Sequence, residues 1–419
     1  MVFYISYAIT LLFLCYHLYK NGKKIELFNI FLILIFIFFG PAFFTYNTVI
    51  DDISSTEALC LTITVISLFL GKYLFKAFTN KLKANNTSLH ISRIKEVSIE
   101  KRPFMIIYFF TFLLFYLALF QFGGINNIII LAKSGGNLTP LDLKELRFDF
   151  KVDGLVGSLI GYFEAIGVFL SMLMFAFAIE YKKKKLLLIN IFFCLMIILW
   201  GASTLHKAIA FFYILQLAIF FYLLKKTVWE WNTKVILKAI LLILILIVPI
   251  YLFLTNSEDV GDAIAQILNR ITDEPNRVLR EYFIWWPNHF SHRLGLNIRP
   301  IHAIFGNGEF EPAYKTIVYQ YIDYSNPFAG TWPTMYIADS WVDFSYYGVL
   351  MFSIVVGFVL TFLDYILKNY RNSFGVALFA GLVGSLFTLI ENSLLTAFLT
   401  GGLLTLPFLF KILVKVKNS

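Results

Sequence analysis

The chain has 419 residues and a net charge of +9, and it is 59% hydrophobic but only 15% charged. A soluble globular domain is about half apolar and about a quarter charged, so this composition excludes one. Repeated apolar runs near 20 residues are long enough for helices to cross roughly 30 Å of hydrocarbon. The runs are continuous rather than alternating, which predicts transmembrane helices instead of a transmembrane barrel.

We therefore predict an all-α, polytopic membrane protein with about eleven transmembrane helices. Eight helices fall within 1–254, which also holds an outer segment at 123–154, and three fall within 347–419. Residues 255–346 form one large external loop between helices 8 and 9. The expected spans are Met1–Tyr19, Leu27–Phe44, Ala58–Leu74, Phe104–Phe122, Leu155–Tyr181, Leu186–Trp200, Ala208–Leu224, Val235–Leu254, Gly348–Leu367, Phe374–Ile390 and Leu394–Leu413.

Lysine and arginine are distributed unequally between the two sides of this topology. The predicted cytoplasmic side carries 21 lysines and 3 arginines, whereas the outer side carries 5 lysines and 6 arginines. The cytoplasmic excess of cations places the amino terminus outside, the carboxyl terminus inside and 255–346 on the external face. The planar arginine fork holds phosphate or carboxylate through paired hydrogen bonds. The outer arginines are thus candidates to bind an anionic ligand or to pair with outer carboxylates.

Five of these arginines stand out by their position. Arg147, in LDLKELRFDFKVDG, comes just before a span, although the alternating charges around it are also typical of a solvated, self-paired face. Arg277 and Arg280 share one face if DEPNRVLREYF is helical, but Arg277 could equally pair with the glutamate four residues further on. Arg293 and Arg299 flank the turn LGLN. All five are candidates for holding a phosphate at the membrane boundary.

Asp339 and Asp343 are one helical turn apart just before a span. A carboxylate at the apolar boundary loses hydration, which favours a role as general base. The alternative is a carboxylate stabilised by the start of a helix. Glu309 and His292 are further candidates for this base. His289 and His292 have loose metal-like spacing, but no third ligand accompanies them, so we predict no metal site.

The region from Tyr282 to Tyr347 contains 18 aromatic residues. Flat aromatic faces among Asn, Asp, Glu and Gln suit sugar rings, whose C–H faces stack while their hydroxyls form hydrogen bonds. The alternative is that the rings anchor the loop at the membrane interface and fill its own core. The candidate sugar-binding residues are Trp285, Trp286, Tyr324, Trp332 and Tyr336.

The chain carries no Walker loop, dinucleotide fingerprint, nucleophile elbow or HExxH motif. An external site has no cytosolic ATP or nucleotide sugar, so a bond formed there needs a donor that is already activated. A lipid-linked diphosphate is such a donor, and arginines beside lipid suit it.

The layout of about eleven spans with a dominant late outer loop resembles that of the O-antigen and capsule repeat-unit polymerases, the Wzy-type membrane glycosyltransferases. The segment NPFAGTWPTMYIADSWVDFSYYG is similar to a family passage that ends in Asp-Phe-Gly and then Gly. The segment GASTLHKAIAFFYI is similar to the family's small-residue turn followed by Arg and a helix. Two departures are that Ser345 follows Asp343-Phe344, and that His206-Lys207 stands where an Arg is usual.

The resemblance implies a GT-C-like fold in the bacterial inner membrane. The implied reaction transfers a growing glycan from undecaprenyl diphosphate to another lipid-linked repeat unit at the outer leaflet. Arginines and Lys207 would hold the diphosphate, and a carboxylate or His292 would take the acceptor's proton, with no metal or other cofactor. The implied partners are undecaprenyl-diphosphate-linked oligosaccharides, membrane lipid, a Wzz-type chain-length regulator and a flippase, but no nucleic acid.

Three alternatives to a polymerase stay open, and one of them is a non-catalytic scaffold of an envelope assembly complex. An O-antigen ligase uses the same donor but a lipid A-core acceptor. A lipid-linked oligosaccharide flippase or other transporter belongs to another class, which usually places charged residues and broken helices at mid-membrane. This chain concentrates its polar residues outside the spans, which argues against transport.

Overall fold

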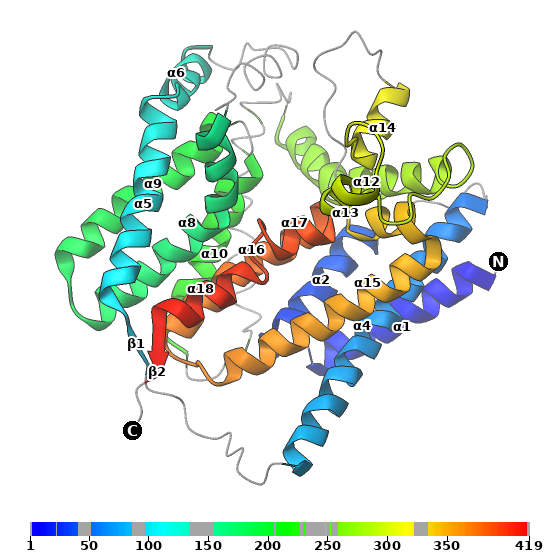
Figure 1. Cartoon of the computed structure of the whole chain (residues 1–419), viewed down its shortest axis with the longest axis horizontal. Coiled ribbons are helices and arrows are strands. Elements are labelled where there is room, and N and C mark those ends of the chain that lie inside the picture. The colour runs from blue at the N-terminus through cyan, green and yellow to red at the C-terminus, as the bar shows by residue number, and fades with distance from the viewer. Residues whose placement is uncertain are drawn as a thin grey trace.

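The structure, a computed structural model, is almost entirely helical in the residues that it describes (Figure 1). Six of the described helices are long and apolar enough to cross a membrane. This confirms an all-α membrane protein, whereas the number of eleven spans and the orientation of the termini stay predictions. The structure describes residues 2–21, 23–40, 52–85, 97–134, 154–204, 207–226, 229–230, 248, 252, 259–321 and 334–416. The six helical stretches are Ser55–Lys81, Lys101–Phe120, Leu159–Glu180, Lys184–Ser203, Ile337–Lys368 and Ser373–Glu391.

The elements follow the chain as alternating long helices and short connections. Two strands form a short antiparallel ribbon, with Val97 opposite Val416 and Ile99 opposite Val414, which ties the start of α5 to the end of α18. The helices and strands are α1 (Val2–Asn21), α2 (Leu27–Phe39), α4 (Asp52–Asn85), β1 (Val97–Ile99), α5 (Lys101–Phe120), α6 (Gly124–Ser134), α8 (Gly154–Glu180), α9 (Lys184–Ser203), α10 (Lys207–Leu224), α12 (Val260–Trp285), α13 (Arg299–Phe305), α14 (Ala313–Tyr321), α15 (Ile337–Lys368), α16 (Ser373–Glu391), α17 (Leu394–Phe398), α18 (Thr405–Leu413) and β2 (Val414–Val416).

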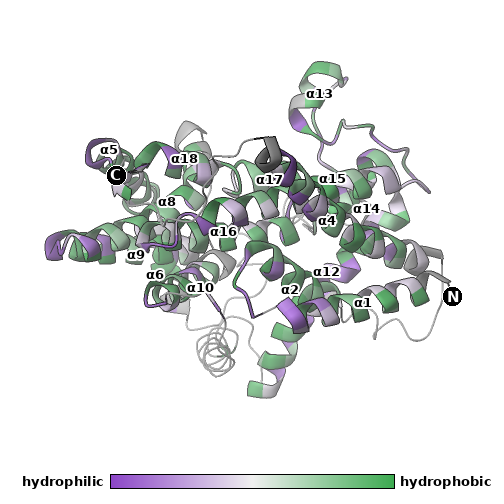
Figure 2. Cartoon of the chain, turned by 90° about the horizontal axis from the view of Figure 1, so that it is seen from below, coloured by the Kyte–Doolittle hydropathy of each residue, from purple (hydrophilic) through white to green (hydrophobic). Residues whose placement is uncertain are grey.

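Helix α16 lies between two groups of helices (Figure 1). It packs against α2 on one side and against α8 and α10 on the other. Gln216 of α10 donates from Nε2 to the carbonyl oxygen of Gly381 in α16 at 3.0 Å, a buried polar link between two apolar helices. Apolar residues prevail along most of these helices (Figure 2). The described bundle therefore has its core around α16.

The last predicted span, Leu394–Leu413, is divided into the two short helices α17 and α18. The break falls at Gly401 and Gly402, where Gly402 has a φ of +94° that glycine adopts without steric cost. Ser385 donates from Oγ to the carbonyl oxygen of Gly401 at 2.6 Å. A side chain of α16 thus satisfies a backbone group that the break leaves free. The predicted span Val235–Leu254 lies outside the described residues, apart from positions 248 and 252.

Three helices of the predicted loop, α12, α13 and α14, gather near the amino end of α15 (Figure 1). Helix α12 packs on α2 and α4, and Asn276 donates from Nδ2 to the carbonyl oxygen of Phe38 at 2.8 Å. Helix α15 begins at Ile337, before the predicted span, and has non-helical backbone angles at Phe344 and Ser345. Much of the polar loop is therefore helical and rests on the transmembrane bundle.

Helices α4 and α15 approach each other so closely that backbone meets backbone. A Cβ atom on Gly71 would lie 2.2 Å from the carbonyl oxygen of Ile354, and one on Gly357 would lie 2.1 Å from that of Leu68. No side chain fits at either position without moving a helix. Between helices in lipid the hydrophobic effect contributes little, so close packing at small residues becomes the main source of association.

We expect Gly71→Val and Gly357→Val each to lower the free energy of unfolding by about 1–3 kcal/mol or more, because the new side chain overpacks the α4–α15 contact. The matched control is Gly161→Val in α8, since no atom of another described segment would lie within 4 Å of a Cβ at Gly161. Unfolding midpoints of the purified proteins in detergent measure the difference. Equal midpoints for all three variants would contradict the close contact.

Candidate functional site

The carboxylate of Asp343 anchors a turn of the loop to the amino end of α15. Its Oδ1 accepts backbone N–H bonds from Gly295 and Asn297, both at 3.1 Å, and the residue is only 1% exposed. Leu294 and Gly295 have φ values of +52° and +92°. Such left-handed residues turn successive N–H groups into a small concavity that receives an anion. The turn formed by LGLN thereby supplies the backbone N–H groups that bind the Asp343 carboxylate.

Asn297 joins Asp343 to its neighbour Asp339. Besides its backbone bond to Asp343, Asn297 donates from Nδ2 to Oδ1 of Asp339 at 2.6 Å. The backbone N–H of Ala313 donates to the side-chain oxygen of Asn297 at 2.9 Å, which fixes the orientation of the amide. One asparagine therefore holds two carboxylates of α15 and the first residue of α14 together.

The guanidinium of Arg293 lies beside this cluster. It donates to the carbonyl oxygen of Glu311 at 2.5 Å and to Oγ1 of Thr316 at 2.8 Å. Its central carbon lies 5.5 Å from the centre of the Trp286 ring, a cation–π distance. Burial lowers the pKa of Arg293, while the neighbouring carboxylates of Glu311, Asp343 and Asp339 raise it. The charge of Arg293 therefore offsets part of the negative charge of the two aspartates.

Each aspartate of the cluster has one oxygen that accepts no hydrogen bond from the part of the chain that the structure describes. Among the described residues, the N–H groups that reach Asp343 and Asp339 all end on Oδ1. No described residue donates to either Oδ2. A poorly hydrated carboxylate with one open oxygen can accept a proton from a bound hydroxyl. The cluster is thus suited to general-base chemistry.

Aromatic side chains pack beside the cluster, against Arg293 and His292. Trp286 is fully buried, stacks on Tyr282 with ring centres 6.1 Å apart, and accepts at its carbonyl oxygen a 2.8 Å bond from Nε1 of Trp341. His292 lies against the Trp341 ring, with Nδ1 3.3 Å from the carbonyl oxygen of Val342. Burial also raises the pKa of Tyr282 well above its usual range. These rings position Arg293 and His292.

The candidate sugar-binding residues fall into three groups. Trp286 and Tyr336 are 0% exposed, and Tyr336 shares a 2.8 Å hydrogen bond with Oγ of Ser353, so neither ring offers a face to a sugar in this structure. Trp285 is half-buried and stacks on Phe290. The remaining two, Tyr324 and Trp332, lie outside the described residues.

Among the described residues, the other predicted arginines make no hydrogen bond or ion pair with Asp339 or Asp343. Arg280 extends to α4, where its Nε lies 3.6 Å from the buried carboxylate of Glu57. Arg277 and Arg299 are exposed, and no carboxylate of the described residues lies within 4 Å of either. The remaining predicted site residues are the exposed Glu309, Lys207 at the start of α10 with its side chain outside the described part, and Arg147 outside the described residues.

Asn297 and Thr316 were not among the residues singled out from the sequence. The segment Gly-Leu-Asn at 295–297 places an amide side chain directly after a glycine turn. Amide side chains often hydrogen-bond near turns, so this pattern is a signal that could have pointed to Asn297. Nothing local marks Thr316. Comparisons with models of known protein families, with curated proteins and with solved structures found no match.

Ser345 lies next to the cluster in a backbone conformation that favours glycine. Its φ is +54° and its ψ is −143°, and it follows Phe344 at the kink of α15. Such a conformation costs a non-glycine residue about 1–3 kcal/mol.

We expect Ser345→Gly to raise the free energy of unfolding by about 1 kcal/mol, because relief of the strain exceeds the 0.5–1 kcal/mol or so that glycine loses in chain entropy. Ser345→Val has the opposite expected effect, since a β-branched residue tolerates this φ poorly. Unfolding midpoints in detergent compare the two. A glycine variant no more stable than the parent protein would show that the kink is not strained.

Proposed function

We propose that this protein is a membrane glycosyltransferase that joins glycans carried on a polyprenyl diphosphate, and that Asp339, Asp343 and Arg293 form its reaction centre. The observation that carries the proposal is a pair of neighbouring carboxylates beside a guanidinium, with Asp343 buried and Asp339 half-buried. Among the described residues, no donor reaches the Oδ2 of either aspartate. The resemblance to Wzy-type polymerases supplies the substrate class.

In the proposed reaction, an acceptor sugar hydroxyl gives its proton to Oδ2 of Asp339 and attacks the anomeric carbon of the donor. The bond between that carbon and the diphosphate oxygen breaks, and the diphosphate leaves with the electron pair. The hydrogen bond from Asn297 holds Asp339 in place at Oδ1. Asp343, which accepts two backbone N–H groups, acts mainly to position the turn. General-base catalysis of this kind contributes about 10²–10⁴-fold to a rate.

The leaving diphosphate needs cations with free N–H groups. Three of the five N–H groups of Arg293 already have acceptors, so Arg293 has limited capacity for a ligand. Arg277 and Arg299 are exposed and have no carboxylate within 4 Å among the described residues. We therefore assign the diphosphate contacts chiefly to Arg277 and Arg299, and Arg293 to the charge balance of the aspartates.

We expect Asp339→Asn to lower the rate of glycan transfer by about 10²–10⁴-fold with little loss of stability, because the amide oxygen still accepts the bond from Asn297 but cannot take a proton. Asp259→Asn is the matched control, since Asp259 is an exposed aspartate of the same loop and an amide oxygen can still accept the backbone N–H bond from Asp262. The measurement uses purified full-length protein with polyprenyl-diphosphate-linked repeat units and gel sizing of products.

Full activity of Asp339→Asn would remove Asp339 as the base. The same assay separates the two glycosyltransferase alternatives. Long polymer formed from repeat units alone is the polymerase result, whereas transfer only to an added lipid A-core acceptor is the ligase result. Absence of any transfer by the folded parent protein with either acceptor would overturn the proposed function.

We expect Arg277→Gln and Arg299→Gln to raise the KM for the lipid-linked donor about tenfold each, since each loses a charge-assisted pair of hydrogen bonds to phosphate. Their unfolding midpoints stay within error of the parent protein because both side chains are exposed. If both variants keep the parent KM, the diphosphate is held by other residues.

A further inference from the structure

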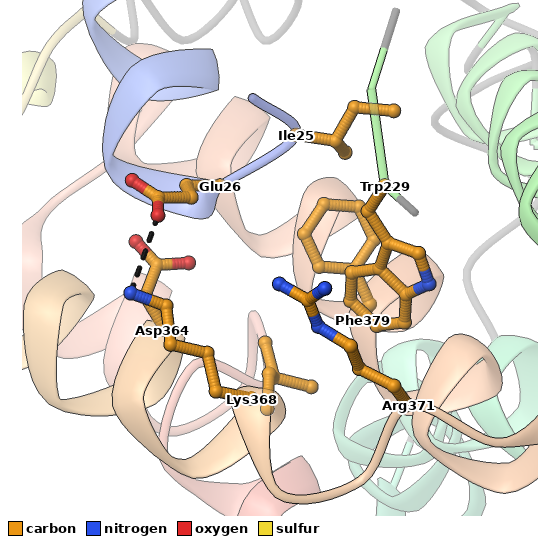
Figure 3. A pocket seen from close by; sticks show the side chains of 8 residues that line it. Ile25, Glu26, Trp229, Asp364, Lys368, Arg371 and Phe379 are labelled. Atoms are coloured by element: carbon orange, nitrogen blue, oxygen red, sulfur yellow. Dashed lines mark ion pairs between the residues drawn. The ribbon is translucent and has the colours of Figure 1, made fainter. Parts of the chain in front are cut away.

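A small cavity lies at the carboxyl end of α15, at the other end of this helix from the Asp339–Asp343 cluster (Figure 3). Three parts of the chain that are distant in sequence converge on it. They are the residues just before α2, the segment that follows α10, and the α15–α16 junction. The enclosed space is only water-sized, but charged side chains surround its mouth. The residues that line it are Ile25, Glu26, Trp229, Asp364, Leu367, Lys368, Arg371 and Phe379.

The two carboxylates at this cavity already have partners. Both oxygens of Asp364 accept backbone N–H groups at the amino end of α2, from Leu27 at 2.7 Å and from Phe28 at 3.1 Å. Glu26 lies 3.3 Å from the ammonium of Lys368. Neither carboxylate forms an ion pair within 4 Å with a further cation of the described residues.

Arg371 is a further cation at this cavity. Its guanidinium extends toward the space between Lys368 and Trp229 in Figure 3, and its central carbon lies 5.9 Å from the centre of the Trp229 ring. The Trp229 ring is itself held, because it lies 5.1 Å from the Phe379 ring and is only 6% exposed. Among the described residues, no carboxylate lies within 4 Å of Arg371 and none accepts a hydrogen bond from it. The aromatic platform thus supports the guanidinium and leaves its N–H edge open.

A third cation adds to the positive charge of this end. The ammonium of Lys72, from α4, lies 4.1 Å from the centre of the Phe28 ring and interacts electrostatically with Glu26, Asp364 and Lys368. Lys72, Lys368 and Arg371 thus outnumber the two carboxylates, and Lys76, which also interacts electrostatically with Lys72, adds to the positive excess. Glu26, Lys368 and Arg371 lie at the ends of helices, the level at which lipid headgroups meet a membrane protein.

We propose that this cavity mouth binds a phosphate group, held by the fork of Arg371 and assisted by Lys368. An arginine fork matches the geometry of phosphate oxygens, and basic pockets between transmembrane helices bind anionic lipid headgroups. The phosphate belongs either to an anionic phospholipid or to a water-soluble phosphate. It sits at the exposed mouth, because the enclosed space is too small for it. The site is independent of the glycosyltransferase proposal, since it lies at the opposite end of α15.

The test uses purified full-length protein in detergent. Native mass spectrometry measures binding of phosphatidylglycerol and of phosphatidylcholine, and calorimetry measures binding of orthophosphate. We expect Arg371→Gln to weaken phosphatidylglycerol binding about tenfold or more, and Arg371→Lys to weaken it less, because lysine keeps the charge but loses the fork. The matched control is Arg102→Gln, which removes another exposed arginine at the start of a predicted span and leaves binding within about twofold.

The outcomes separate the two sources of phosphate. Binding of phosphatidylglycerol that depends on Arg371, without orthophosphate binding, identifies a lipid headgroup. Orthophosphate binding that depends on Arg371 identifies a water-soluble phosphate. If Arg371→Gln, verified as folded by its unfolding midpoint, binds both probes as the parent protein does, or if Arg102→Gln loses as much binding as Arg371→Gln, the proposed site is overturned.

Discussion

The close contact between α4 and α15 is the constraint on which both polar ends of the molecule depend. Lipid provides little hydrophobic drive between helices, so this contact relies on two glycines, Gly71 and Gly357, that let each backbone reach the other. Beyond the kink, residues 346–368 rise about 34 Å as a helix, which matches a hydrocarbon core of roughly 30 Å. We therefore expect helix α15 to place the Asp343 cluster and the Arg371 cavity on opposite sides of a membrane.

The two ends of α15 use the same physical device. Asp343 receives the backbone N–H groups of the turn at 293–297, and Asp364 receives those at the amino end of α2. A buried carboxylate is costly unless donors satisfy it, and backbone N–H groups are strong donors that need no side-chain ordering. Each aspartate thus fixes a separate segment of the chain to one helix. Around each fixed segment, a guanidinium on an aromatic ring supplies positive charge.

Hydropathy predicted the helical membrane class, because lipid demands continuous apolar runs, and six of the described helices are long and apolar enough to be such spans. Local spacing also placed Asp339 and Asp343 together, since residues one turn apart share a helix face. The sequence could not predict that Asn297 links them, because that contact depends on the left-handed turn before it. It also could not predict that Arg280 extends to Glu57, since helical spacing carries no information about partners on distant helices. Tertiary contacts therefore decide which of the predicted arginines lies beside a carboxylate, as Arg280 does, and which are exposed, as Arg277 and Arg299 are.

Side-specific labelling of single cysteines tests the role of α15 most directly. In a background where Cys15, Cys60 and Cys194 are replaced by alanine, Leu294→Cys marks the Asp343 end and Arg371→Cys marks the cavity end. A membrane-impermeant maleimide is added to sealed vesicles of known orientation. We expect each cysteine to react from one side only, and the two cysteines to react from opposite sides. Labelling of both cysteines from the same side would contradict this expectation.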